Sequence, residues 1–226
     1  MSDPDTLLKL RDAAVYLIAL ILSICVHEFG HAFVADKLGD PLPRAQGRVT
    51  LNPIAHIDPI GTLLFPLVGF FMASGGMIGW GKPVQISLSA RAITRKVSIK
   101  TAHLLVALAG PMMNVLFMFV LSGVFFAMLK FAGGSSAERL LNPLAFMIRL
   151  NVLLACFNLI PCPPLDGGAV LRGILPRNLE YISDYLDKYG FALFFLLLFT
   201  GALSFVLRPA MAAAMWWIGT LMGWAS

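Results

Sequence analysis

Long apolar stretches constrain the fold of this chain more than any other feature. Five or six such stretches can be marked along its 226 residues, and about 20 apolar residues are enough for one helix to cross a bilayer core. Hydrophobic residues make up 58% of the chain and charged residues only 13%, whereas charged residues are about 25% of an average soluble domain. The sequence therefore predicts an all-α polytopic membrane protein.

Charge and cysteine content argue against several other classes. The formal charge of +5 is modest, and the basic residues lie in short segments between apolar runs, where they orient helices. No nucleic-acid motif is present, so we expect no nucleic-acid partner. Cys25 and Cys156 lie in apolar runs, which does not indicate a disulfide framework, and we expect Cys162 to be a small apolar filler.

The predicted elements follow the apolar runs and the residues that interrupt them. Prolines and glycines break the apolar stretch 57–81, which makes it a poor continuous helix. Alternation of apolar and polar residues predicts short β-strands at 46–51 and 84–88. Helices are expected in five places, the last two of them further C-terminal helices: about 6–37, 102–130, 143–160, 190–207 and 209–225.

The first of these helices contains residues 25–31, CVHEFGH, within a run that is otherwise apolar. Positions four apart share one helix face, so His27 and His31 can direct both imidazoles at one metal ion. Glu28 lies beside them, and HExxH is the signature of zinc proteases, in which this glutamate is the general base. The alternative is that all three bond neighbouring helices. Each ionisable group in a membrane helix costs about 2.5 to 3.5 kcal/mol, which favours a compensating metal.

Two histidines leave a catalytic zinc site incomplete, because such sites usually have three protein ligands. Most other acidic residues lie near the ends of apolar runs or in polar segments, and the exception is Asp166 in FNLIPCPPLDGG, residues 157–168. Prolines end a helix there, and Gly167 and Gly168 would let the backbone turn tightly around the carboxylate. Asp166 is therefore the candidate third ligand, with an ordinary turn aspartate as the alternative.

Three blocks of the sequence, HEFGH, GPMMN (110–114) and NLIPCPPLDGG, together resemble the site-2 protease family of intramembrane zinc metalloproteases, over about residues 13–170. The resemblance implies that His27, His31 and Asp166 hold one zinc ion and that Glu28 is the catalytic base. It also implies a three-helix catalytic core.

Many relatives carry PDZ or CBS domains, for which this chain has no room. We therefore expect a single integral membrane domain over 1–226, with its core at 6–170 and accessory C-terminal helices at 190–225.

A shared metal ion also constrains the direction of the helices. Since His27 and Asp166 must lie at similar depth, the helices at 6–37 and 143–160 should run in the same direction, and 57–81 should be re-entrant or lie along the interface. Segments 38–56, 82–101 and 163–189 then share one side. That side holds 11 of the 17 basic residues: Lys37, Arg44, Arg48, Lys82, Arg91, Arg95, Lys96, Lys100, Arg172, Arg177 and Lys188. We expect it to be the cytoplasm, with the active site facing it from the plasma membrane.

The expected chemistry is hydrolysis of a peptide bond in or near a transmembrane segment of a protein or peptide substrate. Glu28 would take a proton from zinc-activated water, and the Asn158 side chain would stabilise the oxyanion. Both Asn158 and Asn114 have the alternative of simply bonding another helix. An unwound substrate could pair with the predicted strand edges, and His56 and His103 are interpreted as structural.

Two rival functions stay open. An ion-conducting or metal-transporting protein would distribute polar residues over several helices, whereas here they concentrate at one constellation. A non-catalytic scaffold related to the protease would be expected to lack Glu28 or a ligand, and none is missing.

Overall fold

The computed structural model of the chain describes residues 4–72, 79–88, 97–132 and 135–225. The regular elements within these ranges are all helical: α1 (Pro4–Lys37), α2 (Leu42–Ala45), η1 (Pro53–Ala55), η2 (Pro59–Leu64), α3 (Phe65–Met72), α4 (Ile99–Phe131), α5 (Ser135–Asn158), α6 (Asp166–Ile174), η3 (Arg177–Leu179), α7 (Glu180–Phe199) and α8 (Ala202–Ala225). Among the described residues, four stretches are long and apolar enough to cross a membrane, namely Asp5–Lys37, Ile99–Phe131, Arg139–Asn158 and Ala202–Ala225. The predicted all-α class is confirmed, with several helices long and apolar enough to span a membrane.

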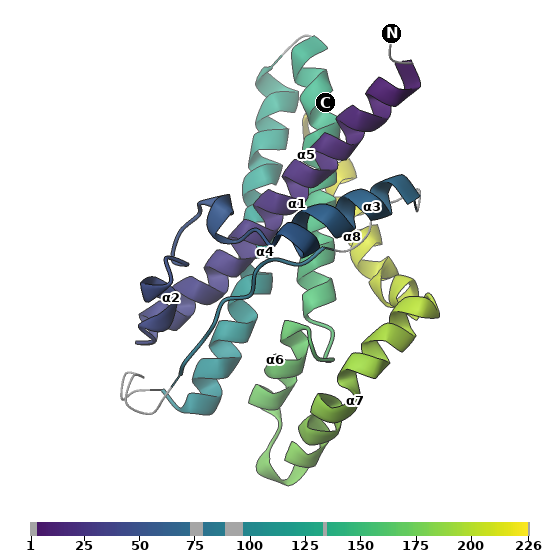
Figure 1. The fold of residues 1–226 in the computed structure, drawn as a ribbon. Coiled ribbons are helices and arrows are strands. Elements are labelled where there is room, and N and C mark those ends of the chain that lie inside the picture. The colour runs from purple at the N-terminus through teal and green to yellow at the C-terminus, as the bar shows by residue number, and fades with distance from the viewer. Residues whose placement is uncertain (1–3, 73–78, 89–96, 133–134, 226) are drawn as a thin grey trace.

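Helices α1, α4 and α5 pack together at the centre of the molecule. Figure 1 shows α1 and α5 running in the same direction and α4 running opposite to both. Apolar residues join α1 to α5, among them Leu20, Ile24 and Leu154. Gly30 of α1 lies so close to α4 that an added Cβ atom would be 2.6 Å from the carbonyl oxygen of Ala109, as is common where small residues let membrane helices approach. The parallel course predicted for the first and third core helices is therefore present.

The C-terminal helices differ from the prediction in their boundaries. The apolar runs placed a break at Arg208 and Pro209, but the structure breaks the chain between α7 and α8, at residues 200–201. Gly201 has a positive φ of 74°, a backbone conformation in which glycine commonly ends helices. Pro209 instead lies inside α8. Helix α7 begins at Glu180, ten residues before the helix expected at about 190–207.

Helix α5 also begins earlier than predicted, at Ser135 rather than 143. Pro143 therefore lies within the helix and does not start it. Membrane helices accommodate such prolines because neighbouring groups satisfy the carbonyl that the ring leaves without a donor.

The segment predicted to be re-entrant contains η2 and α3 and then returns to its starting point. The apolar helical stretch Pro59–Phe71 is about 20 Å long at 1.5 Å per residue, less than the roughly 30 Å of a bilayer core. The backbone N–H of Trp80 donates to the carbonyl of Gly61 over 3.1 Å, and the Thr62 hydroxyl donates to the Trp80 carbonyl over 2.7 Å. After α3 the chain therefore returns to η2, where the segment began. That this segment enters the membrane stays a prediction.

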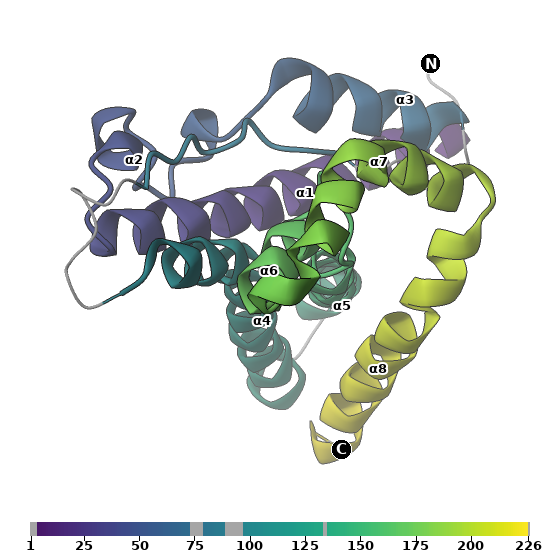
Figure 2. The same ribbon diagram turned by 90° about the horizontal axis from the view of Figure 1, so that it is seen from below.

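The strands predicted at 46–51 and 84–88 are wrong, because the structure has no strand at either place. Residues 79–88, here the 79–88 segment, run along the side of α1 without regular structure (Figures 1 and 2). Side chains and loop carbonyls, the latter from Gly61 and His56, bond its backbone in place of a neighbouring strand. Buried Arg48 donates to the carbonyls of Ala55, Lys82 and Pro83, and Asp40 accepts from the backbone N–H of Ser87 over 2.5 Å.

Candidate metal centre

His27 and His31 lie one turn apart on the face of α1 that packs against α4. Each residue is 8% exposed, and their Nε2 atoms are 3.1 Å apart. Their spacing of four residues places both imidazoles on one helix face. The helix geometry expected from HEFGH is therefore present, and both rings are inside the protein.

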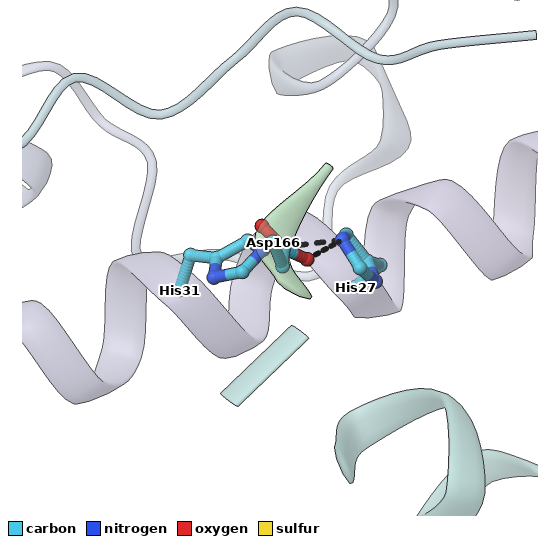
Figure 3. Close-up of side chains that lie close together, drawn as sticks. All are labelled: His27, His31 and Asp166. Carbon is cyan, nitrogen blue, oxygen red and sulfur yellow. Dashed lines mark hydrogen bonds and ion pairs between the residues drawn. The ribbon is translucent and has the colours of Figure 1, made fainter. Parts of the chain in front are cut away.

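Asp166 reaches the same point from the first turn of α6. The chain leaves α5 at Asn158, turns through residues 159–165 and starts α6 at Asp166. Its Oδ2 atom lies 3.1 Å from Nε2 of His27 and 3.3 Å from Nε2 of His31, and Figure 3 shows both imidazoles directed at this carboxylate. Gly167 allows the tight turn, since an added Cβ would overlap the carbonyl oxygens of Leu159 and Ile160.

A glycine of α4 makes room for the two imidazoles. A Cβ atom added to Gly110 would overlap Nε2 of His31 and lie 2.7 Å from Cε1 of His27. The first glycine of the GPMMN block therefore lets the α4 backbone pack directly against the cluster.

The ring nitrogens that face away from Asp166 have fixed partners on α4. Nδ1 of His27 lies 2.7 Å from Oδ1 of Asn114, and Nδ1 of His31 lies 2.7 Å from the carbonyl oxygen of Val106. Both partners are acceptors, so each imidazole carries its proton on Nδ1 and presents a lone pair at Nε2. Partners of this kind orient metal-binding histidines in proteins.

The cluster fits a divalent metal ion. Oδ2 of Asp166 is buried and has no hydrogen-bond donor among the described residues, so three lone-pair-bearing atoms face one another at 3.1 to 3.3 Å. Zinc–ligand bonds of about 2.0–2.1 Å in a tetrahedron put neighbouring ligand atoms about 3.3 Å apart.

Glu28 is partly buried and faces the 79–88 segment. Its Oε2 atom accepts a hydrogen bond of 3.3 Å from the backbone N–H of Val84. An added Cβ at Gly81 would be 3.3 Å from Cγ of Glu28, so this segment lies close against the glutamate. The carboxylate adjacent to the histidines is thus held in place by a segment from outside the three-helix core.

Other predicted residues have partners outside the cluster. The Asn158 amide donates 2.9 Å to the carbonyl of Leu154 in its own helix. Buried Cys162 contacts the carbonyl of Gly190, in keeping with a packing role. His56 is 1% exposed and bonds the Thr50 carbonyl, while His103 lies on an exposed position of α4.

Sequence reasoning missed Ser23 and Asn151, which are fully buried and hydrogen-bonded to each other and to Asn114. Two signals could have found them. Ser23 lies four residues before His27 and so shares its helix face, and an asparagine in an apolar membrane helix needs a polar partner.

The fold and the cluster define a class: a polytopic helical protein in which a His-His-Asp group that could hold a metal ion lies inside the helix bundle, beside a glutamate. The family model described as "Peptidase family M50" matches residues 121–200. Similar proteins include "Putative zinc metalloprotease YwhC" of Bacillus subtilis, which is 36% identical over 202 residues, covering 87% of this chain and 85% of the relative.

Two further relatives are more distant. "Putative zinc metalloprotease Rip2" of Mycolicibacterium smegmatis is 30% identical, covering 88% of this chain and 73% of its own. "Zinc metalloprotease MJ0392" of Methanocaldococcus jannaschii is 28% identical, covering 84% of this chain and 44% of its own. No solved structure matches the chain significantly. The chain belongs to peptidase family M50, the site-2 protease family.

Proposed function

We propose that this chain is an intramembrane zinc metalloprotease that hydrolyses peptide bonds in or near transmembrane segments of membrane proteins. The observation that carries the proposal is the convergence of ligand atoms of His27, His31 and Asp166 within 4.8 Å of one another. Glu28 directly follows His27 in the sequence. Family membership and the names of the relatives support the same chemistry.

In this proposal the two Nε2 atoms and the Asp166 carboxylate hold one zinc ion per chain. Bound zinc supplies a Lewis acid that makes water more acidic and polarises a carbonyl group. Asn114 and the Val106 carbonyl keep the Nε2 lone pairs directed at the ion.

Glu28 has the position of the general base. It takes a proton from the attacking water and returns it to the departing amine. The hydrogen bond from Val84 holds one carboxylate oxygen, so the other is available for the proton. Asn158 would donate its amide to the developing oxyanion, for which it must exchange its bond to the Leu154 carbonyl.

We place the protein as one integral domain in the plasma membrane, with the centre towards the cytoplasm. The centre lies where α1 and α5 approach their C-terminal ends, the side that holds most of the basic residues. The substrate is a transmembrane protein or peptide that unwinds to reach the centre. The strands at 46–51 and 84–88, whose edges were expected to receive it, are absent from the structure.

The test uses the purified full chain reconstituted in liposomes with a single-span substrate protein. We expect one zinc per chain, cleavage that stops on chelation and resumes with added zinc, and a Glu28→Gln variant that keeps zinc but does not cleave. Glu180→Gln is the matched control, because Glu180 is half-exposed and pairs with Lys100 over 3.1 Å. Equal cleavage by the Glu28→Gln and wild-type chains, or a wild-type chain without zinc, would refute the proposal.

A further inference from the structure

A buried chain of polar side chains links the candidate metal centre to a residue that bonds none of the three ligands. Ser23, Asn114 and Asn151 come from α1, α4 and α5, and each is 0% exposed. Buried amides without partners are costly. Three such residues in a network therefore join the three core helices at one point.

The network has a single arrangement of its protons, which can be read from Asn151 outward. The amide nitrogen of Asn151 donates to the Met147 carbonyl and to the Ser23 hydroxyl, both at 2.9 Å. A carbonyl can only accept, so Oδ1 of Asn151 must face Asn114. The Ser23 hydroxyl in turn donates to the Ala19 carbonyl over 2.7 Å.

Asn114 passes this orientation on to the histidine. Its amide nitrogen donates to Oδ1 of Asn151 over 2.8 Å and to the Ser23 carbonyl over 3.1 Å. Both hydrogens of that amide are then used, and Oδ1 is left to face Nδ1 of His27 at 2.7 Å. An acceptor at that position requires an N–H on Nδ1, which leaves the lone pair of His27 on Nε2.

We infer that Asn151 is a positioning residue that fixes the His27 tautomer through Asn114 and so prepares Nε2 for the metal ion. The inference rests on the proposed metal role of His27. It is specific to that histidine, because His31 is held by the backbone carbonyl of Val106, which no substitution removes.

The role follows from what the wrong arrangement would require. With the proton of His27 on Nε2, the Nδ1 lone pair would oppose Oδ1 of Asn114. Turning the Asn114 amide to relieve this would oppose its oxygen to two acceptors, the Ser23 carbonyl and Oδ1 of Asn151. Removing the Asn151 acceptor leaves only one of these two conflicts, so the metal-competent tautomer is less strongly selected.

The test measures zinc affinity by competition with a chromophoric chelator, and the visible absorption of the cobalt-loaded chain. Asn151→Leu removes the acceptor at similar volume, and Asn151→Asp keeps it, since a buried carboxyl stays protonated. Ser122→Ala is the control, because Ser122 of α4 is buried like Asn151 but bonds Met118 and Trp217, away from the centre.

We expect Asn151→Leu to weaken zinc binding about tenfold, the lower end for residues behind metal ligands, and to change the cobalt spectrum. Asn151→Asp should stay within about threefold of wild type, because the Asn114 partner survives. If Asn151 served helix packing alone, Asn151→Asp would weaken zinc binding more than Asn151→Leu, because leucine suits a membrane interior better than a carboxyl group. Should the leucine variant not fold, Asn151→Ala removes the same acceptor without adding volume.

Two results would overturn the inference in distinguishable ways. A wild-type chain that binds no zinc removes the proposed function and this role together. A wild-type chain that binds zinc, with leucine or alanine variants that match it in affinity and spectrum, removes the positioning role alone.

Discussion

Gly110 and His31 face each other so closely across the α1–α4 contact that no side chain fits between the Cα atom of Gly110 and the imidazole. A glycine inside a helix usually costs about 0.5–1 kcal/mol relative to alanine. Here that cost is offset by space for the two imidazole rings.

Gly110→Ala should therefore displace the imidazoles and lower zinc affinity more than tenfold. Gly123→Ala is the matched control in the same helix, because an added Cβ there meets no atom within 4 Å. The control should bind zinc like wild type and unfold at the same or a higher temperature. Equal zinc affinity in the two variants would show that the space left by Gly110 is not needed to position the imidazoles.

Arg48 is 5% exposed and joins the 79–88 segment to the loop after α1. Arg48→Met leaves three backbone carbonyls without this donor, so the segment should hold Val84 less firmly against Glu28. We expect kcat/KM for cleavage to fall by roughly tenfold, which corresponds to about 1.4 kcal/mol, while zinc content stays unchanged.

The control for that change is Arg44 in the neighbouring helix α2. Arg44 pairs with Asp36 over 2.7 Å, but its side chain is 68% exposed, and such surface pairs contribute little. Arg44→Met should cleave like wild type. If Arg48→Met does so too, the contact between Val84 and Glu28 has no part in catalysis.

Asn158→Ala separates an oxyanion role from a bond within α5. Loss of an oxyanion donor typically lowers kcat by about 10²–10³, and zinc affinity should not change. Asn142, exposed near the other end of α5, provides the control variant Asn142→Ala. A kcat for Asn158→Ala close to that of the control would leave Asn158 with only its bond to Leu154.

Much of this architecture could be predicted because it depends on local patterns. The length of apolar runs defined α1 and α4, and a spacing of four residues put His27 and His31 on one face. Asp166 was predicted to join them because two histidines leave a zinc site incomplete, and the shared ion in turn predicted that α1 and α5 run in the same direction. Their role as ligands stays a prediction until metal is measured.

The failures concern features that depend on partners far away in the sequence. Alternation at 84–88 indicated a strand, but the carboxylates of Glu28 and Asp40 accept from the backbone N–H groups of Val84 and Ser87, where a second strand would have offered carbonyls. Likewise, nothing local to Asn151 shows that its amide meets Asn114 on α4. The break at Gly201 was missed because Pro209 is the stronger helix breaker in sequence, although the backbone conformation favours the glycine.

The most direct test of the account is the zinc content and zinc affinity of the wild-type chain and of Asp166→Asn, which replaces the carboxylate by a neutral group of the same shape. We expect one zinc per wild-type chain, and an affinity lower by at least about a hundredfold in the variant, because a ligand from α6 is lost. A wild-type chain without zinc, or a variant that binds zinc as tightly as wild type, would contradict the claim that His27, His31 and Asp166 hold one metal ion.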